Sequence, residues 1–107
     1  MPLYEQRVYQ VRTGEMPTAI KLYQDEGWPA FEAAGLADHC MGYFITDTGA
    51  LHRLVHIWKF EDDVERRAFW EKIYAFPAFI GFAKQIRPLL NSQEVTLMKN
   101  APFGPVL

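Results

Sequence analysis

The chain has 107 residues, of which 50% are hydrophobic and 15% aromatic, and its formal net charge is -2. This composition excludes a disordered chain, and the length suits one domain, residues 1–107, with its own hydrophobic core. The 11 basic residues are scattered among 13 acidic ones, which argues against a nucleic-acid partner.

The start of the chain has neither a basic region nor an apolar run, so we expect no signal peptide. No apolar stretch approaches the roughly 20 residues that a bilayer-spanning helix needs. The single cysteine, Cys40, excludes an internal disulfide, and we expect it to be a small buried side chain in a strand. These features predict a soluble, cytoplasmic protein.

Residues 3–12 alternate in the way that is typical of a β-strand. Residues 17–34 carry apolar side chains at helical spacing and are predicted to form a helix. Because Pro29 lies inside this pattern and removes a backbone hydrogen bond, we expect a kink or break near Gly27 and Trp28.

Residues 39–60 read as two strands folded back on each other across a turn at 47–50. We assume an even number of residues in the loop, because an odd number would reverse which side chains share a face. In the shortest case the loop is Thr48-Gly49, and the residue numbers of two facing positions add up to 97. This register pairs Tyr43 with Leu54, Met41 with His56, and His39 with Trp58.

This register divides the hairpin into two faces. The first face carries His39, Met41, Tyr43, Ile45, His52, Leu54, His56 and Trp58. The second carries Cys40, Gly42, Phe44, Arg53, Val55 and Ile57.

After the hairpin, Asp62 or Asp63 is expected to cap a helix that ends near residue 74. A shorter helix is predicted over 77–86 and a final strand over 91–99, followed by a tail that lies on a surface. The buried stripe of the longer helix is predicted to consist of Val64, Ala68, Phe69 and Ile73.

The element order β-α-β-β-α-β predicts an α+β, ferredoxin-like fold. Its four-stranded antiparallel sheet has the order 4-1-3-2, with the helices on one face. The other face is bare in a monomer, yet the hairpin has large apolar groups on both faces. An apolar patch of Phe44, Val55, Ile57 and Cys40 therefore predicts a homodimer through the sheet face. The alternative is that the tail or the first loop folds over this face.

Several short motifs follow one another in a characteristic order. They are Glu5-x-Arg7-x-Tyr9 with Gly14, Gly42-Tyr43 with Gly49, His56-x-Trp58-x-Phe60 with Arg66-Arg67, and Arg87-Pro88-Leu89. Together they resemble the NIPSNAP family over nearly the whole chain. Phe60 and Gln6 depart from it, since the family often has Tyr and an aliphatic residue there. The resemblance implies a dimeric α/β barrel of two ferredoxin-like subunits, a group that includes cofactor-free monooxygenases, haem enzymes and proteins without known chemistry.

The three histidines do not predict a metal site. His52 and His56 lie about 13 Å apart along one strand, too far for one metal ion to bridge. His39 and Cys40 point to opposite faces, and no glycine-rich phosphate loop is present. We therefore expect no metal and no cofactor.

The candidate site is a polar cluster on the central strands, and it has two readings. As a structural cluster, a Glu5–Arg7 ion pair with Arg66 or Arg67 nearby locks the dimer or the junction of sheet and helices. As a functional site, it is a small-molecule pocket with Trp58 as its apolar wall. Its members are Glu5, Arg7, Tyr9, His56, Trp58 and Arg66.

His56 is the member of this cluster that titrates near neutral pH, so it is the candidate general base. The sequence thus leaves two functions open. The first is a small dimeric binding or scaffold module with a pocket between sheet and helices. The alternative is a cofactor-independent enzyme, monooxygenase- or isomerase-like, that acts on a small aromatic or activated substrate.

Overall fold

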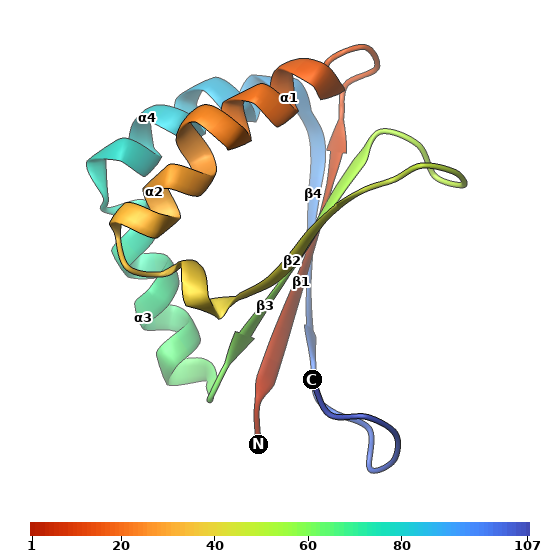
Figure 1. Ribbon diagram of the computed structural model, residues 1–107, viewed down its shortest axis with the longest axis vertical. Coiled ribbons are helices and arrows are strands. Elements are labelled where there is room, and N and C mark those ends of the chain that lie inside the picture. The colour runs from red at the N-terminus through yellow and green to blue at the C-terminus, as the bar shows by residue number, and fades with distance from the viewer.

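The computed structural model describes residues 1–107 and contains one four-stranded antiparallel sheet in the order β2-β3-β1-β4. Helices cover one face of the sheet and leave the other face without a helix (Figure 1). This confirms the ferredoxin-like α+β fold and the predicted strand order. The strands are β1 (Leu3–Val11), β2 (Cys40–Ile45), β3 (Arg53–Phe60) and β4 (Leu90–Met98). The helices are α1 (Met16–Leu22), α2 (Trp28–Ala33), α3 (Asp63–Tyr74) and α4 (Pro77–Ile86).

Strand β1 lies at the centre of the sheet and brings the predicted polar cluster together. Its side chains alternate, so that Glu5, Arg7 and Tyr9 all point toward the helices and are buried. On β3, the partner of Arg7 is His56 and the partner of Glu5 is Trp58. The expectation that the first and third strands are neighbours is therefore confirmed.

The first helical segment is interrupted where the sequence places Pro29. A π-helical turn, η1 (Tyr23–Gly27), joins α1 to α2, and Pro29 lies in the first turn of α2. A proline cannot donate the backbone hydrogen bond of a regular helix and its ring crowds the preceding turn, so the widened turn accommodates both effects. The irregularity predicted near Gly27 is confirmed. Gly27 also lets the helix approach α4, since an added Cβ would lie 2.7 Å from Cζ of Phe82.

The register of the hairpin differs from the prediction. Facing positions sum to 99, not 97, because the loop between the strands is longer than the shortest turn. The number of residues between facing positions is even, as predicted, because Ile45 faces Leu54. A sum of 97 and a sum of 99 therefore place the same β2 and β3 residues on a common face. Tyr43 therefore lies opposite His56, and Ile45 opposite Leu54.

The two ends of the hairpin hold further corrections. A β-bulge between Cys40 and Gly42 places Cys40, and not His39, opposite Trp58. The assignment of Cys40 to the face of Phe44 was wrong for this reason. His52 does not belong to a strand face, because it lies in the loop with a φ of 62°.

Helix α3 begins where predicted but is rotated from the predicted stripe. The Asp62 carboxylate accepts a hydrogen bond of 2.8 Å from the backbone N–H of Glu65, which confirms the cap. Val64 is 78% exposed, and the buried side chains are Phe69, Trp70 and Ile73. The side of α3 that faces the sheet also includes Arg66, whose side chain bonds to Glu5.

The face of the sheet without helices carries Phe44, which is 55% exposed, and the half-buried Val55 and Ile57. The C-terminal segment turns back toward one end of the sheet (Figure 1). There the carbonyl oxygen of Leu107 accepts 2.7 Å hydrogen bonds from the Tyr4 hydroxyl and from Lys59 Nζ. The tail thus contacts Tyr4 at that end of the sheet and leaves Phe44 exposed.

Candidate functional site

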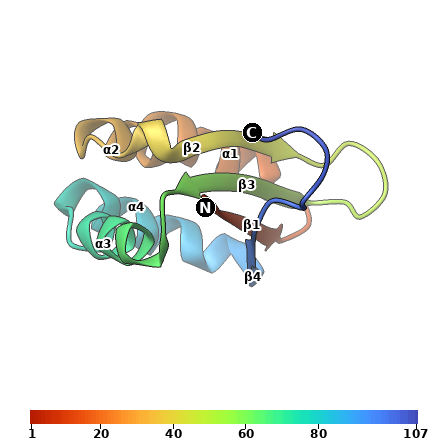
Figure 2. The ribbon, with the colours of Figure 1, turned by 90° about the horizontal axis from the view of Figure 1, so that it is seen from below.

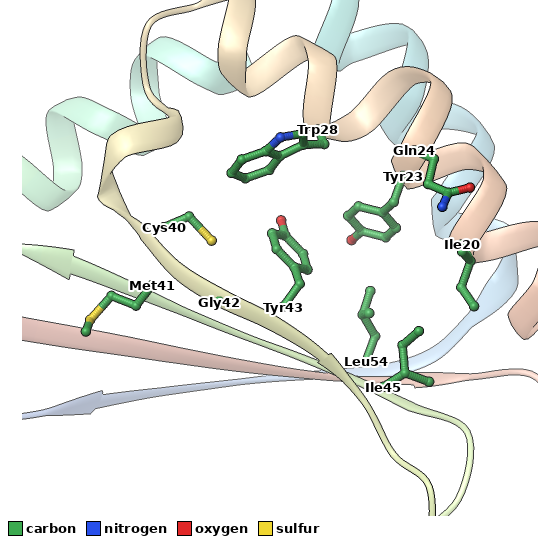
Figure 3. Close-up of a pocket in the computed structure, with 10 residues that line it drawn as sticks. All are labelled: Ile20, Tyr23, Gln24, Trp28, Cys40, Met41, Gly42, Tyr43, Ile45 and Leu54. Carbon is green, nitrogen blue, oxygen red and sulfur yellow. The ribbon is translucent and has the colours of Figure 1, made fainter. Parts of the chain in front are cut away.

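A cleft of about 560 Å³ opens between the first helical segment and the edge strand β2. Figure 2 shows α1 and α2 running beside β2, while α3 and α4 form a second row. Eight of the ten lining residues are hydrophobic and none is charged. The cleft is thus an apolar site of the size that proteins use for small molecules. Its main walls are Ile20, Tyr23, Trp28, Tyr43, Ile45 and Leu54 (Figure 3).

Few polar atoms reach this cleft. The Tyr43 hydroxyl points from the sheet toward the Trp28 ring, and the Tyr23 hydroxyl points down toward the sheet (Figure 3). Burial raises the pKa of both tyrosines well above the ordinary value, so both phenols stay protonated and can donate hydrogen bonds. Burial also raises the pKa of the Cys40 thiol, which makes it a poor nucleophile.

Glu5 is the centre of the predicted polar cluster and is fully buried. Its carboxylate accepts hydrogen bonds from Arg7 Nε at 2.5 Å, from Trp70 Nε1 at 3.1 Å, and from Arg66. Arg66, and not Arg67, is therefore the arginine of α3 that reaches the sheet. Arg67 bonds to Asp63 at the surface.

The guanidinium of Arg7 has a partner on each side. It donates to the hydroxyls of Tyr9 at 3.0 Å and Tyr74 at 3.3 Å, and it lies 3.8 Å from the centroid of the Trp70 ring. Burial on its own lowers the pKa of Arg7, but the neighbouring Tyr9 and the hydrogen bond to Glu5 outweigh it and raise the pKa overall. Arg7 is thus a permanent buried cation.

His56 lies on the other side of Arg7 and is 2% exposed. Its Nδ1 accepts a 2.7 Å hydrogen bond from the indole N–H of Trp58, while its Nε2 is buried without a partner. Burial, and secondarily the charge of Arg7, lower its pKa to about 3. The imidazole is therefore neutral at physiological pH, which weakens the prediction that it is a general base.

The predicted residues adjoin one another, but they form part of the closed core and not the walls of the cleft. Trp58 is fully buried, so the wall predicted for it belongs to Trp28 and Tyr43 instead. Tyr43 links the two regions, because its ring stacks on the imidazole of His56 with centroids 4.7 Å apart and planes 6° apart. The polar cluster thus lies in the core behind Tyr43, which separates it from the cleft.

The sequence reasoning missed Trp70, Tyr74, Tyr23 and Trp28. A buried stripe at positions 66, 69, 70 and 73 would have identified Trp70. The apolar pattern did not indicate this stripe, because position 66 is a charged arginine. Trp28 could not be placed, because the π-helical turn shifts the helical phase between Tyr23 and Trp28.

Within residues 1–107, no three His, Cys, Asp or Glu side chains converge in a way that could hold a metal ion. No helix has the length and apolar character to cross a membrane. Neutral phenols, a neutral imidazole and aromatic surfaces are the chemistry that this region offers. Such groups bind and orient a ligand, and none of them is an activated nucleophile.

Comparisons with known proteins agree with this organisation. The sequence model of the NIPSNAP family matches residues 4–105. A NIPSNAP family protein of unknown function from Agrobacterium tumefaciens has 30% identity and a TM-score of 0.89, with 99% of this chain and 94% of that chain covered. An uncharacterized NIPSNAP domain protein from Burkholderia xenovorans has 31% identity and a TM-score of 0.84, with 97% and 99% covered.

A more distant structure shares the fold alone. An antibiotic biosynthesis monooxygenase has 19% identity and a TM-score of 0.65, with 94% of this chain and 99% of that chain covered. No curated protein matches the chain. The family match over nearly all residues and the two NIPSNAP structures lead to one conclusion: the chain belongs to the NIPSNAP family.

Proposed function

We propose that the protein is a binding module that holds a small, largely apolar molecule in the cleft between α1–η1–α2 and β2. The cleft itself carries this proposal, because it combines a volume of about 560 Å³ with hydrophobic walls. Its aromatic side chains are mutually braced, since the ring of Tyr43 contacts both Trp28 and Tyr23 with centroids 5.9 and 5.5 Å apart. These contacts hold the aromatic walls of the unliganded cleft in place.

Ethylbenzene is a suitable first probe, because it is apolar, uncharged and small enough to enter the cleft. Trp28 is the tryptophan that lines the cleft, whereas Trp58 and Trp70 are buried in the core. We expect ethylbenzene to shift the Trp28 indole N–H signal in ¹H–¹⁵N NMR spectra and to leave those of Trp58 and Trp70 nearly unchanged.

Two neighbouring substitutions on β2 give a matched pair. Ile45 lines the cleft and Phe44 points to the opposite face of the sheet. Ile45→Trp should fill the cleft and weaken ethylbenzene binding at least tenfold, whereas Phe44→Trp should leave it unchanged. Binding that survives Ile45→Trp, or no Trp28 shift up to the solubility limit of the probe, would contradict the proposal.

The second part of the proposal is a homodimer through the face of the sheet that carries no helix. Its support is the exposed Phe44 beside Val55 and Ile57, since an uncovered apolar patch on a sheet is typical of an interface. The face also carries Arg53 and Lys59 on β3 and Glu94 on β4, so that opposite charges are available for a two-fold arrangement.

Light scattering on a sizing column tests the dimer. The wild type should elute with twice the subunit mass at micromolar concentration, and Phe44→Asp should convert it to a monomer. Ile80→Asp on α4 is the control, because Ile80 is 39% exposed on the helical side and should not affect assembly. A monomeric wild type would refute the dimer without affecting the cleft.

A cofactor-independent enzyme is the second candidate function. The observation in its favour is the unpartnered Nε2 of His56 directly behind Tyr43. The lowered pKa of His56 weighs against it, because an imidazole with a pKa of about 3 is a weak base at neutral pH. Any turnover that depends on His56 should therefore show no change in rate with a midpoint near pH 6.5.

A further inference from the structure

Two hydrogen-bonding atoms remain unsatisfied where the cleft meets the core. The Tyr43 hydroxyl and Nε2 of His56 are both buried without a partner. Burying a polar group without a partner is costly, so native proteins rarely keep one without a reason. These two belong to stacked rings that face each other across β2 and β3.

The hydrogen bond from Trp58 determines which of these atoms can donate. Because Nδ1 of His56 accepts the indole N–H of Trp58, the proton of the neutral imidazole must be on Nε2. Nε2 is therefore an N–H donor. The Tyr43 phenol keeps its proton as well, so the stacked pair presents two unused donors, and its one unused acceptor is the phenol oxygen of Tyr43.

The surroundings determine the charge that a ligand can carry. No charged residue lines the cleft, so a buried carboxylate or ammonium group would have no counterion there. The fixed charge of Arg7 lies next to His56 on the neighbouring strand, and it disfavours a cation further. An uncharged oxygen acceptor needs no counterion and is not repelled by Arg7. It would also accept a hydrogen bond from the unpartnered Tyr43 hydroxyl.

We infer that the cleft selects an uncharged, largely apolar ligand with an acceptor oxygen, such as a ketone or ester carbonyl, to which the Tyr43 hydroxyl donates a hydrogen bond. This inference rests on the proposed binding function. The indole ring of Trp28 lies over the Tyr43 hydroxyl (Figure 3), so this hydrogen bond requires the indole ring to move aside. Nε2 of His56 lies behind Tyr43 in the core and does not line the cleft.

The experiment compares acetophenone, ethylbenzene and benzoate, which share one aromatic ring and differ in the polar group. Each is titrated into the full-length protein at pH 7 and followed by the Trp28 indole signal. The affinities are then measured again in Tyr43→Phe. The control is Tyr74→Phe, because the Tyr74 hydroxyl bonds to Arg7 away from the cleft.

Tyr43→Phe should weaken acetophenone binding about fivefold, the loss expected for one net hydrogen bond, and should leave ethylbenzene unchanged. Benzoate should bind at least tenfold more weakly than acetophenone to the wild type. The control should not alter any of the affinities.

Equal effects of Tyr43→Phe on acetophenone and ethylbenzene would overturn the inference, as would benzoate binding more tightly than acetophenone. In both cases the binding module itself would survive. Failure of acetophenone and ethylbenzene alike to shift the Trp28 signal would instead overturn the proposed function and the inference together.

Discussion

Two polar regions lie side by side on the helical face of the sheet, and they differ in how completely their hydrogen bonds are satisfied. The Glu5 carboxylate is fully buried and has three donors around it, from Arg7, Arg66 and Trp70. The Tyr43 hydroxyl, in the wall of the cleft, has no partner.

Burial and charge alone would single out the Glu5 cluster as the functional site. Its bonds, however, are directed to other parts of the same chain, which is typical of a cluster that holds sheet and helix together. Unused hydrogen-bonding capacity next to an open cleft is the better indicator of a binding site. The substitutions below test this distinction, beginning with the largest expected effect.

Glu5→Gln should be the most damaging change. It removes the only buried anion between Arg7 and Arg66 and leaves Arg7 as an uncompensated buried cation. We expect the free energy of unfolding to fall by about 3–5 kcal/mol in a urea titration. Glu71→Gln, at an exposed site on α3, should cost almost nothing. A loss below about 1 kcal/mol for Glu5→Gln would mean that the cluster does not hold the fold together.

The stability of the wild type should decrease as the pH falls from 6.5 toward 3. The pKa of His56 is about 3 in the folded state against 6.5 in the unfolded state, so only the unfolded state binds a proton in that window. This linkage removes at most about 1.4 kcal/mol per pH unit. In His56→Gln the unfolding free energy should depend less steeply on pH across the same window. Parallel pH profiles for the two proteins would argue against a neutral, buried His56.

Gly27→Ala should show that the helical wall of the cleft is closely packed even though the cleft is open. The new Cβ would lie 2.7 Å from Cζ of Phe82, which is itself buried in the core. We expect a loss of about 1–3 kcal/mol in thermal or chemical unfolding. Gly81→Ala is the control, since nothing lies within 4 Å of its Cβ position and alanine favours the helix. Equal stability of both variants would contradict close packing at Gly27.

Removing a single hydroxyl from each region gives the smallest and most direct comparison. Tyr43→Phe should raise the unfolding free energy by about 1 kcal/mol, because that hydroxyl has no partner to lose and its removal ends the cost of burying it. Tyr9→Phe should cost about 1–2 kcal/mol, because the Tyr9 hydroxyl accepts a hydrogen bond from the buried Arg7. A larger loss of stability for Tyr43→Phe than for Tyr9→Phe would mean that the Tyr43 hydroxyl, and not the Tyr9 hydroxyl, helps to hold the fold together.

The sequence predicted the fold because alternation and helical spacing are local signals. The two-residue period of the first strand placed Glu5, Arg7 and Tyr9 on one buried face, and the motif order identified the family. The assumption of an even hairpin loop also placed Tyr43 on the same face as His56, as the structure has it. These predictions needed no knowledge of distant contacts.

The lining of the cleft could not be predicted, because it depends on two departures from regular geometry. The π-helical turn at Tyr23–Gly27 changes the direction of the side chains that follow it. The bulge beside Met41 turns Cys40 toward the cleft. Each effect arises from packing, which a periodic pattern does not encode.

The bulge between Cys40 and Gly42 has a consequence for how this family can vary in length. Cys40 lies opposite Trp58 and Gly42 opposite Ile57, so Met41 is an extra residue between two consecutive rungs of the ladder. A chain that lacked Met41 would keep both pairings, and no other side chain would change face. An insertion or deletion at this position would thus widen or narrow the mouth of the cleft, which Met41 lines, while the core behind it stays the same. In an alignment of relatives, a gap at position 41 would mark a difference at the mouth of the cleft and not a difference in fold.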